Sequence, residues 1–290
     1  MSPASQPVAD HGAAATVGLR NATRLPALGQ GSWNLGQGRH PAAQEIDALR
    51  TGCGLGMTLI DTAEMYGDGR SESLIGRALA GLAQRPRLVS KVLPSNASAR
   101  GIVRACEASL ARLGVERLDL YLLHWRGGAR LPEVVDTFEQ LRDAGRIAGW
   151  GVSNFDVDDM EALWSVPGGD RCLVNQVLYH VGSRGIEFDL LPWCIDHEVA
   201  VMAYSPLGSR ALLEDATLAR IGERRGVSAT AVALAWAIRG GHVVAIPESG
   251  SVAHVRENAA ALQLRLTADD LALLDRHFPP PVRKLPLDVL

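Results

Sequence analysis

Short apolar runs alternate with helical segments along most of this chain, and the alternation constrains the fold more than any other feature. The apolar runs occupy residues 57–60, 87–93, 117–123, 146–152, 172–178, 199–203 and 242–246. Segments with a 3.6-residue period and recognisable ends lie at 98–113, 132–144, 156–164 and 228–239. Counting the glycine-rich stretch 28–36, we expect eight parallel strands, which are nearly wholly apolar as such strands must be. The pattern predicts a (β/α)8 barrel.

The segments at the two ends of the chain carry separate expectations. Residues 1–15 are expected to form a mobile tail and residues 16–290 a single barrel domain. TVGL (16–19) and RLPAL (24–28) flank a short polar link, which predicts an N-terminal β-hairpin before the barrel. Pro41 is placed in the first turn of a helix that runs to about Gly54. After Phe278 a short proline-rich C-terminal loop is expected.

Charge, cysteines and hydropathy argue against several classes of function. A formal net charge of -3 gives no basic face for nucleic acid or an anionic membrane. The 8 histidines show no metal-site spacing, so no metal is expected. The four cysteines lie far apart, which favours buried free thiols over a disulfide framework. With neither a secretory signal nor an apolar run of transmembrane length, we expect a cytoplasmic protein that binds a small molecule, as a monomer or weak homo-oligomer.

The residues that end the predicted strands are polar, and this is the main indication of function. The successive strands end on Asp61, Lys91, His124, Ser153 with Asn154, Gln176, Tyr204, and Glu248 with Ser249. In a barrel these carboxyl ends converge on one face, where such enzymes react. Each residue alone has a structural interpretation, since Asp61 could cap a turn and Lys91 could extend to the surface. Taken together, with Tyr66 on the loop after the first of these strands, they predict one shared pocket.

Several motifs at these strand ends together resemble the aldo-keto reductase family. They are DTAEMYG around Tyr66, VSKV around Lys91, LLHW, GVSNF, NQVLYH, AYSPLG and VRENAAAL. The resemblance runs in order from about Leu28 to Leu262. It implies a (β/α)8 barrel that binds a nicotinamide cofactor without a Rossmann domain, and the chain has no G-x-G-x-x-G between a strand and a helix. It also implies the reduction of aldehydes or ketones to alcohols.

The resemblance implies roles for four residues in that reduction. Tyr66 matches the family's proton donor, a phenol whose ordinary pKa of about 10 is too high to act unaided at neutral pH. Lys91 matches the lysine whose charge favours the phenolate, and Asp61 matches the acid that pairs with that lysine. His124 matches the residue that orients the substrate oxygen, so that hydrogen bonds stabilise the charge developing there.

The resemblance also implies a cofactor site along the same strand ends. Ser153, Asn154 and Gln176 match the residues that bind the nicotinamide carboxamide, and Tyr204 matches the ring that stacks on the nicotinamide. The remaining matches are Ser205, Leu207 and Gly208 at the pyrophosphate, and Glu248, Ser249, Glu257 and Asn258 toward the adenosine. Trp33 and Trp125 match aromatic residues that line the substrate pocket. In the family the C-terminal loop commonly covers the substrate, so the short loop after Phe278 implies a rather open site.

Two positions depart from the family pattern and leave the cofactor open. Many members carry a lysine after Ile-Pro and an arginine six residues later, both binding the 2′-phosphate of NADPH. This chain has Glu248 and His254 there. A carboxylate would repel that phosphate but could accept from the free 2′-hydroxyl of NADH, so NADPH and NADH both remain expectations.

Two other classes of function were weighed. One is a nicotinamide-nucleotide-sensing binding subunit with little turnover, against which the complete set Asp61, Tyr66, Lys91 and His124 argues. The other is a metal-dependent hydrolase on the same barrel, which would need clustered ligands. His124 is the only histidine among the proposed strand-end residues, so the number of ligands is too small.

Overall fold

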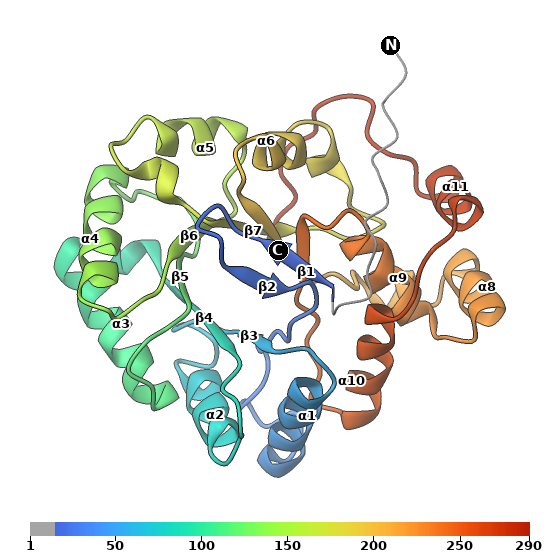
Figure 1. Ribbon diagram of the computed structural model, residues 1–290, viewed down its shortest axis with the longest axis horizontal. Coiled ribbons are helices and arrows are strands. Elements are labelled where there is room, and N and C mark those ends of the chain that lie inside the picture. The colour runs from blue at the N-terminus through green and yellow to red at the C-terminus, as the bar shows by residue number, and fades with distance from the viewer. Residues whose placement is uncertain (1–14) are drawn as a thin grey trace.

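A parallel sheet of seven strands curls into a barrel at the centre of the protein (Figure 1). This computed structural model describes residues 15–290, so positions 1–14 of the predicted mobile tail lie outside the described residues. The strands follow chain order: β3 Leu59–Asp61, β4 Arg87–Val92, β5 Leu120–Leu123, β6 Trp150–Ser153, β7 Val174–Leu178, β8 Ala200–Tyr204 and β9 Val243–Ala245. Each lies within or one residue beyond an apolar run of the sequence, which confirms the predicted order.

The segment Leu28–Gly31 closes the barrel between the first and last of these strands. Leu28 pairs with Ala245 of β9, and Gln30 pairs with Ile60 of β3. This eighth position is shorter than the expected 28–36 run, because Trp33–Gly36 form turns. At Gly31 the chain passes so close to β9 that a Cβ atom would lie 2.8 Å from the Ile246 carbonyl oxygen. A glycine is therefore required at this closure.

Helices surround the barrel and connect its strands (Figure 1). Their bounds are α1 Ala42–Gly54, α2 Arg70–Leu79, α3 Ala99–Leu113, α4 Leu131–Asp143, α5 Val157–Trp164, α6 Leu190–Asp196, α7 Arg210–Leu213, α8 Ala216–Arg225, α9 Ala229–Ile238, α10 Val252–Ala259 and α11 Ala268–His277. Ser98, Asp156 and Ser228, expected as first helical residues, are N-caps whose side chains accept backbone N–H groups. Pro41, expected in the first turn of α1, is likewise the N-cap residue.

The predicted hairpin is present and fills the barrel interior from one end. Its strands are β1 Thr16–Gly18 and β2 Arg24–Pro26, paired antiparallel. Val17 and Leu25 are buried in an interior cluster with Leu59 of β3 and Val244 of β9. A second, larger apolar cluster lies between the sheet and the helices. Because the hairpin packs into the barrel, the polar ends of the strands are left to form the opposite face.

Two further observations bear on the expected class of protein. No helix within residues 15–290 combines the length and apolar character that crossing a membrane requires. All four cysteines are free thiols, of which Cys106, Cys172 and Cys194 are buried and Cys53 is half-buried.

Candidate active site

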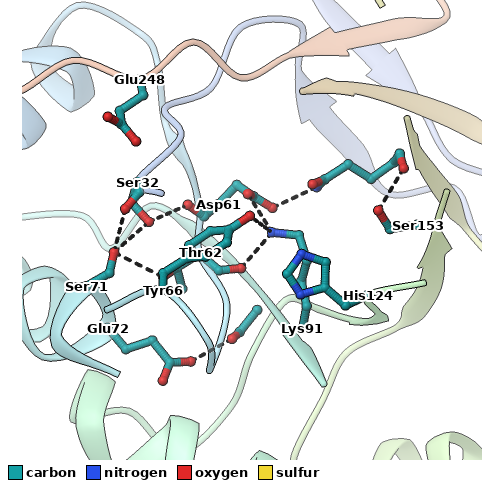
Figure 2. A network of polar contacts seen from close by, with 12 residues as sticks. Ser32, Asp61, Thr62, Tyr66, Ser71, Glu72, Lys91, His124, Ser153 and Glu248 are labelled. Carbon is teal, nitrogen blue, oxygen red and sulfur yellow. Dashed lines mark hydrogen bonds and ion pairs between the residues drawn. The ribbon is translucent and has the colours of Figure 1, made fainter. Parts of the chain in front are cut away.

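The Lys91 ammonium is the centre of a polar network at the carboxyl ends of β3 and β4. Its Nζ donates to Asp61 Oδ2 at 2.7 Å, to the Thr62 carbonyl oxygen at 2.8 Å and to the Tyr66 hydroxyl at 3.1 Å (Figure 2). The Lys91 side chain is 0% exposed. Its three donors are thus all used, which is the condition for burying such a charge. The register of β3 and β4 brings Asp61 and Lys91 together.

Charge and burial set the protonation of this network. Burial alone would lower the pKa of Lys91, but the Asp61 carboxylate and the neighbouring phenol more than offset it and hold that pKa above its ordinary value. Burial raises the pKa of Tyr66, and the pull of Lys91 in the opposite direction does not overcome it. Lys91 therefore lowers the pKa of Tyr66 as expected, but burial raises that pKa by more. Tyr66 is protonated at neutral pH and has a proton to donate.

His124, at the end of β5, lies beside this phenol. The two rings meet edge to face with centroids 5.7 Å apart. Burial and the nearby Lys91 charge lower the pKa of His124 to about 3, so the imidazole is neutral and has one N–H to donate. His124 Nδ1 is buried with no hydrogen-bond partner among the described residues. An unpaired acceptor is less costly there than an unpaired donor, so we assign the proton to Nε2.

Amide and hydroxyl groups continue the network across the ends of β6, β7 and β8. Gln176 Nε2 donates to Asp61 Oδ1 at 2.7 Å, and Ser153 Oγ donates to the Gln176 carbonyl oxygen at 2.8 Å. The Tyr204 hydroxyl donates to Asn154 Oδ1 at 3.0 Å. Asn154 and Ser205 have positive φ angles of 58° and 46°. Such backbone is costly for residues other than glycine and concentrates at functional sites.

Most of the predicted site residues meet at one cavity of about 360 Å³ at this face of the barrel. It is lined by Trp33, Asp61, Tyr66, His124, Trp125, Ser153, Asn154, Gln176, Tyr204, Ser205 and Glu248. Lys91 lies beneath, hydrogen-bonded to Asp61 and Tyr66. Amide and hydroxyl groups beside a phenol fit the carboxamide of a nicotinamide, which both donates and accepts hydrogen bonds. The donor set therefore fits the cofactor that the sequence predicts.

The other predicted cofactor residues lie away from this cavity. Ser249 lines a second cavity, to which Glu248 also contributes. Leu207 packs against the main core, and Gly208 has a φ of +57° beside His180. Glu257 is exposed on α10, while Asn258 is buried with both amide atoms unpaired among the described residues.

The cavity lining also includes residues that the sequence did not single out. Met65 and Asn34 line it, the first from the loop before Tyr66 and the second from the turn after the closing segment. Nothing in the sequence DTAEMYG indicates that its methionine lines a cavity. The contact of Asn34 with Glu248 joins residues 214 positions apart, which no local pattern indicates.

The C-terminal segment reaches the cavity, which corrects the expectation of an open site. Lys284 Nζ lies 3.2 Å from Asp156 Oδ2 and 3.1 Å from Asp189 Oδ2. Further on, the Ser183 hydroxyl donates to Asp288, and Leu290 lines the cavity. The segment is short as predicted, but its anchoring across the loops after β6 and β7 brings its last residue to the site.

Fold and cavity together define a parallel barrel in which tyrosine, lysine, aspartate and histidine cluster beside one cavity at the carboxyl ends of the strands. The sequence profile of the Aldo/keto reductase family matches residues 27–278. The chain belongs to that family, and with it to the oxidoreductases that use a nicotinamide cofactor.

Known proteins of this family are similar over nearly the whole chain. Methylglyoxal reductase YeaE of Escherichia coli (strain K12) is 49% identical over 271 residues, which span 92% of this chain and 95% of that protein. Glyoxal reductase of Bacillus subtilis (strain 168) is 31% identical over 90% of this chain and 91% of its own. An aldo-keto reductase of Klebsiella pneumoniae, solved in complex with NADPH, superposes with a TM-score of 0.92 at 47% identity and covers 96% of this chain and 100% of its own.

Proposed function

We propose that residues 16–290 form one domain that reduces small aldehydes and ketones to alcohols with NADPH, and that Tyr66 donates the proton. The observation that carries this proposal is the contact of 3.1 Å between the Lys91 ammonium and the Tyr66 hydroxyl, at the floor of a cavity. A buried cation beside a protonated phenol stabilises the negative charge that the phenol gains as it gives up its proton.

The residues of this chain divide the work as follows. When bound at these residues, NADPH would supply the hydride that reduces the carbonyl carbon. Tyr66 protonates the carbonyl oxygen, and the His124 N–H donates a hydrogen bond to that oxygen and fixes its position. Asp61 orients Lys91, and it is itself held by Gln176. Ser153, Asn154 and Gln176 would hold the nicotinamide carboxamide, and the Tyr204 ring would pack on the nicotinamide.

The proposed substrates are small aldehydes, with 2-oxoaldehydes such as methylglyoxal first among them. Two similar proteins are named as methylglyoxal and glyoxal reductases. Trp33 and Trp125 are 51% and 39% exposed and, with Leu290, form an apolar part of the cavity lining. Such surface also suits aromatic or medium-length aliphatic carbonyl compounds. The Klebsiella pneumoniae structure with NADPH supports that cofactor for this chain.

Replacing Tyr66 with phenylalanine tests the proposal. We expect Tyr66→Phe to lower kcat by roughly 10²–10⁴ and to leave the Kd for NADPH nearly unchanged, because only the transferred proton is lost. Tyr121→Phe is the matched control, since the buried Tyr121 hydroxyl on β5 has no partner among the described residues. Absorbance of the nicotinamide with methylglyoxal gives kcat, and calorimetry gives Kd. A Tyr66→Phe variant with near wild-type turnover would remove Tyr66 from the mechanism.

The same assay separates the enzyme from a nucleotide-sensing binding subunit. A sensing subunit would bind NADPH but reduce none of a panel of aldehydes and ketones at a measurable rate. The buried and fully bonded Lys91 argues for turnover, because a cation held against a phenol is of no use to binding alone.

A further inference from the structure

Glu72, in the first turn of α2, is a buried carboxylate that lines neither the catalytic nor the second cavity. Its side chain is 0% exposed. Its Oε1 accepts the Ser90 hydroxyl at 2.6 Å, and its Oε2 accepts Arg112 Nε at 2.6 Å (Figure 2). Removing such a charge from water is costly, so a buried ion pair is weak evidence for stability alone. The place of Glu72 beside the catalytic network calls for another explanation.

The bond to Ser90 reaches the strand that carries Lys91. Alternate residues of β4 face opposite sides of the sheet. Val89 belongs to the apolar cluster inside the barrel, whereas Leu88 belongs to the cluster between the sheet and the helices. Lys91 therefore lies on the inner face with the catalytic network, and Ser90 lies on the outer face, where Glu72 meets it. The carboxylate thus holds α2 against β4 directly behind the catalytic lysine.

The bond to Arg112 reaches the loop that carries Tyr66. Between Tyr66 and α2 the chain turns through residues 67–69, whose φ angles are +56°, +53° and +82°. Arg112 lies directly against this turn, since a Cβ atom at Gly69 would lie 2.5 Å from the arginine side chain. Three successive residues in the left-handed region keep their shape only where neighbouring groups fix them. Glu72 orients the arginine that lies there.

The same turn of α2 is tied to β3 by its neighbouring residue, Ser71. The Ser71 backbone N–H donates to the Tyr66 carbonyl oxygen at 3.3 Å. The Ser71 hydroxyl donates to the Ser32 carbonyl oxygen at 2.7 Å, and the Ser32 hydroxyl donates to the Asp61 carbonyl oxygen at 2.8 Å (Figure 2). The first turn of α2 is therefore bonded, directly or through one residue, to both strands that carry the Asp61–Lys91 pair.

We propose that Glu72 is a positioning residue that holds the Tyr66 hydroxyl against the Lys91 ammonium. The carboxylate fixes the start of α2 through Ser90 and the turn after Tyr66 through Arg112. Proton transfer depends on where the phenol lies relative to its cation and to the carbonyl oxygen, and a displacement of about 1 Å can cost roughly 10² in rate. The inference rests on the proposed role of Tyr66 and adds a residue outside the cavity to the same reaction.

Replacing Glu72 with leucine and with glutamine tests the two bonds. Glu72→Leu removes both, so we expect kcat with methylglyoxal to fall roughly 10–10²-fold while KM and the Kd for NADPH stay within about twofold. In Glu72→Gln the amide oxygen can accept from Arg112 and the amide nitrogen can donate to Ser90, so kcat should stay within about threefold of wild type. A glutamine variant as slow as the leucine variant would contradict positioning through these bonds.

Asp270→Ala is the matched control for the loss of a buried ion pair. Asp270, on α11, is 1% exposed and is paired with two arginines of α8. Its replacement should lower Tm, as Glu72→Leu does, and leave kcat unchanged, because neither α8 nor α11 contributes to the catalytic cavity.

A second background shows whether Glu72 acts through the phenol. In Tyr66→Phe, adding Glu72→Leu should change kcat by less than about twofold, because no phenol is left to position. The same loss in both backgrounds would mean a general loss of order and would overturn the assignment, as would near wild-type kcat in Glu72→Leu alone. If Glu72→Leu does not fold, Ser90→Ala replaces it, with an expected loss of kcat of roughly fivefold at unchanged KM. Wild-type kcat in Ser90→Ala would then overturn the proposal.

Failure of the proposed function is visible separately, in Tyr66→Phe alone. Near wild-type turnover in that variant would contradict the acid role of Tyr66 and, with it, the role of Glu72. Loss of turnover in Tyr66→Phe together with unchanged kcat in Glu72→Leu would overturn the positioning role alone.

Discussion

The floor of the catalytic cavity and the rim of the second cavity contain the same kinds of side chain in opposite states. At the floor, Lys91 is wholly buried and all of its donors are used. Arg39 lines the second cavity, as Ser249 does, and at this rim it is exposed and makes no hydrogen bond or ion pair within the described residues. A buried pair of charges is costly to break, whereas an exposed cation is already solvated. We therefore expect the floor to couple stability with catalysis and the rim to contribute little to stability.

The largest effect is expected from replacing Lys91, which lies at the floor of the catalytic cavity. Lys91→Met leaves the Asp61 carboxylate buried with Gln176 as its remaining side-chain partner, so it should cost about 3–5 kcal/mol of unfolding free energy. Turnover should fall by at least roughly 10², because the phenol loses its cation. Urea denaturation and steady-state kinetics measure the two quantities. At the rim, Arg39→Ala should change the unfolding free energy by less than about 1 kcal/mol.

A double variant sharpens the same comparison. Adding Asp61→Asn to Lys91→Met removes the unpaired charge, so much of the lost stability should return while turnover stays low. If stability does not recover, the damage comes from lost packing and not from the unpaired carboxylate. If Lys91→Met alone keeps both stability and turnover, the contrast between floor and rim is wrong.

His124 gives an intermediate effect, visible as a dependence of stability on pH. Its folded pKa is about 3, against about 6.5 when unfolded. As pH falls below about 6.5 the unfolded chain binds a proton that the folded chain does not, so stability falls with pH. Between pH 6.5 and pH 5 the His124 contribution should cost about 2 kcal/mol. Relative to His124→Asn, the wild type should lose that amount in denaturation at the two pH values. A constant difference would mean that His124 takes up a proton in the folded protein.

The same contrast explains what the sequence could predict. Asp61, Lys91 and His124 end apolar strands, and a closed barrel of parallel strands leaves such residues no place other than one shared face. Their position follows from periodicity alone. Arg39 and Glu45 lie on a turn and at the start of α1, where an acidic residue looks like ordinary first-turn charge. Their position depends on how the 32–41 turns pack on the connection that follows β9, and no local pattern encodes that contact.

The C-terminal segment that Lys284 anchors also lies on loops of the site. Changes there are expected to have the smallest effect on stability and turnover. Lys284 is 43% exposed and shares its ammonium between Asp156 and Asp189. Exposed pairs of this kind contribute about 0–1 kcal/mol, so Lys284→Ala should scarcely alter the unfolding free energy. Lys284→Ala should instead change substrate binding, since the segment that Lys284 anchors places Leu290 in the catalytic cavity.

We expect Lys284→Ala to raise KM for an apolar aldehyde by about threefold or less and to leave kcat unchanged, because uniform binding is lost and the acid–base centre is not touched. Leu290→Ala removes the apolar contact but keeps the anchor, so it should raise KM by a similar amount. If the anchor acts through Leu290, the double variant should be no worse than either single change. Additive losses would show that the two residues act separately, and the C-terminal segment would then lie beside the site without shaping it.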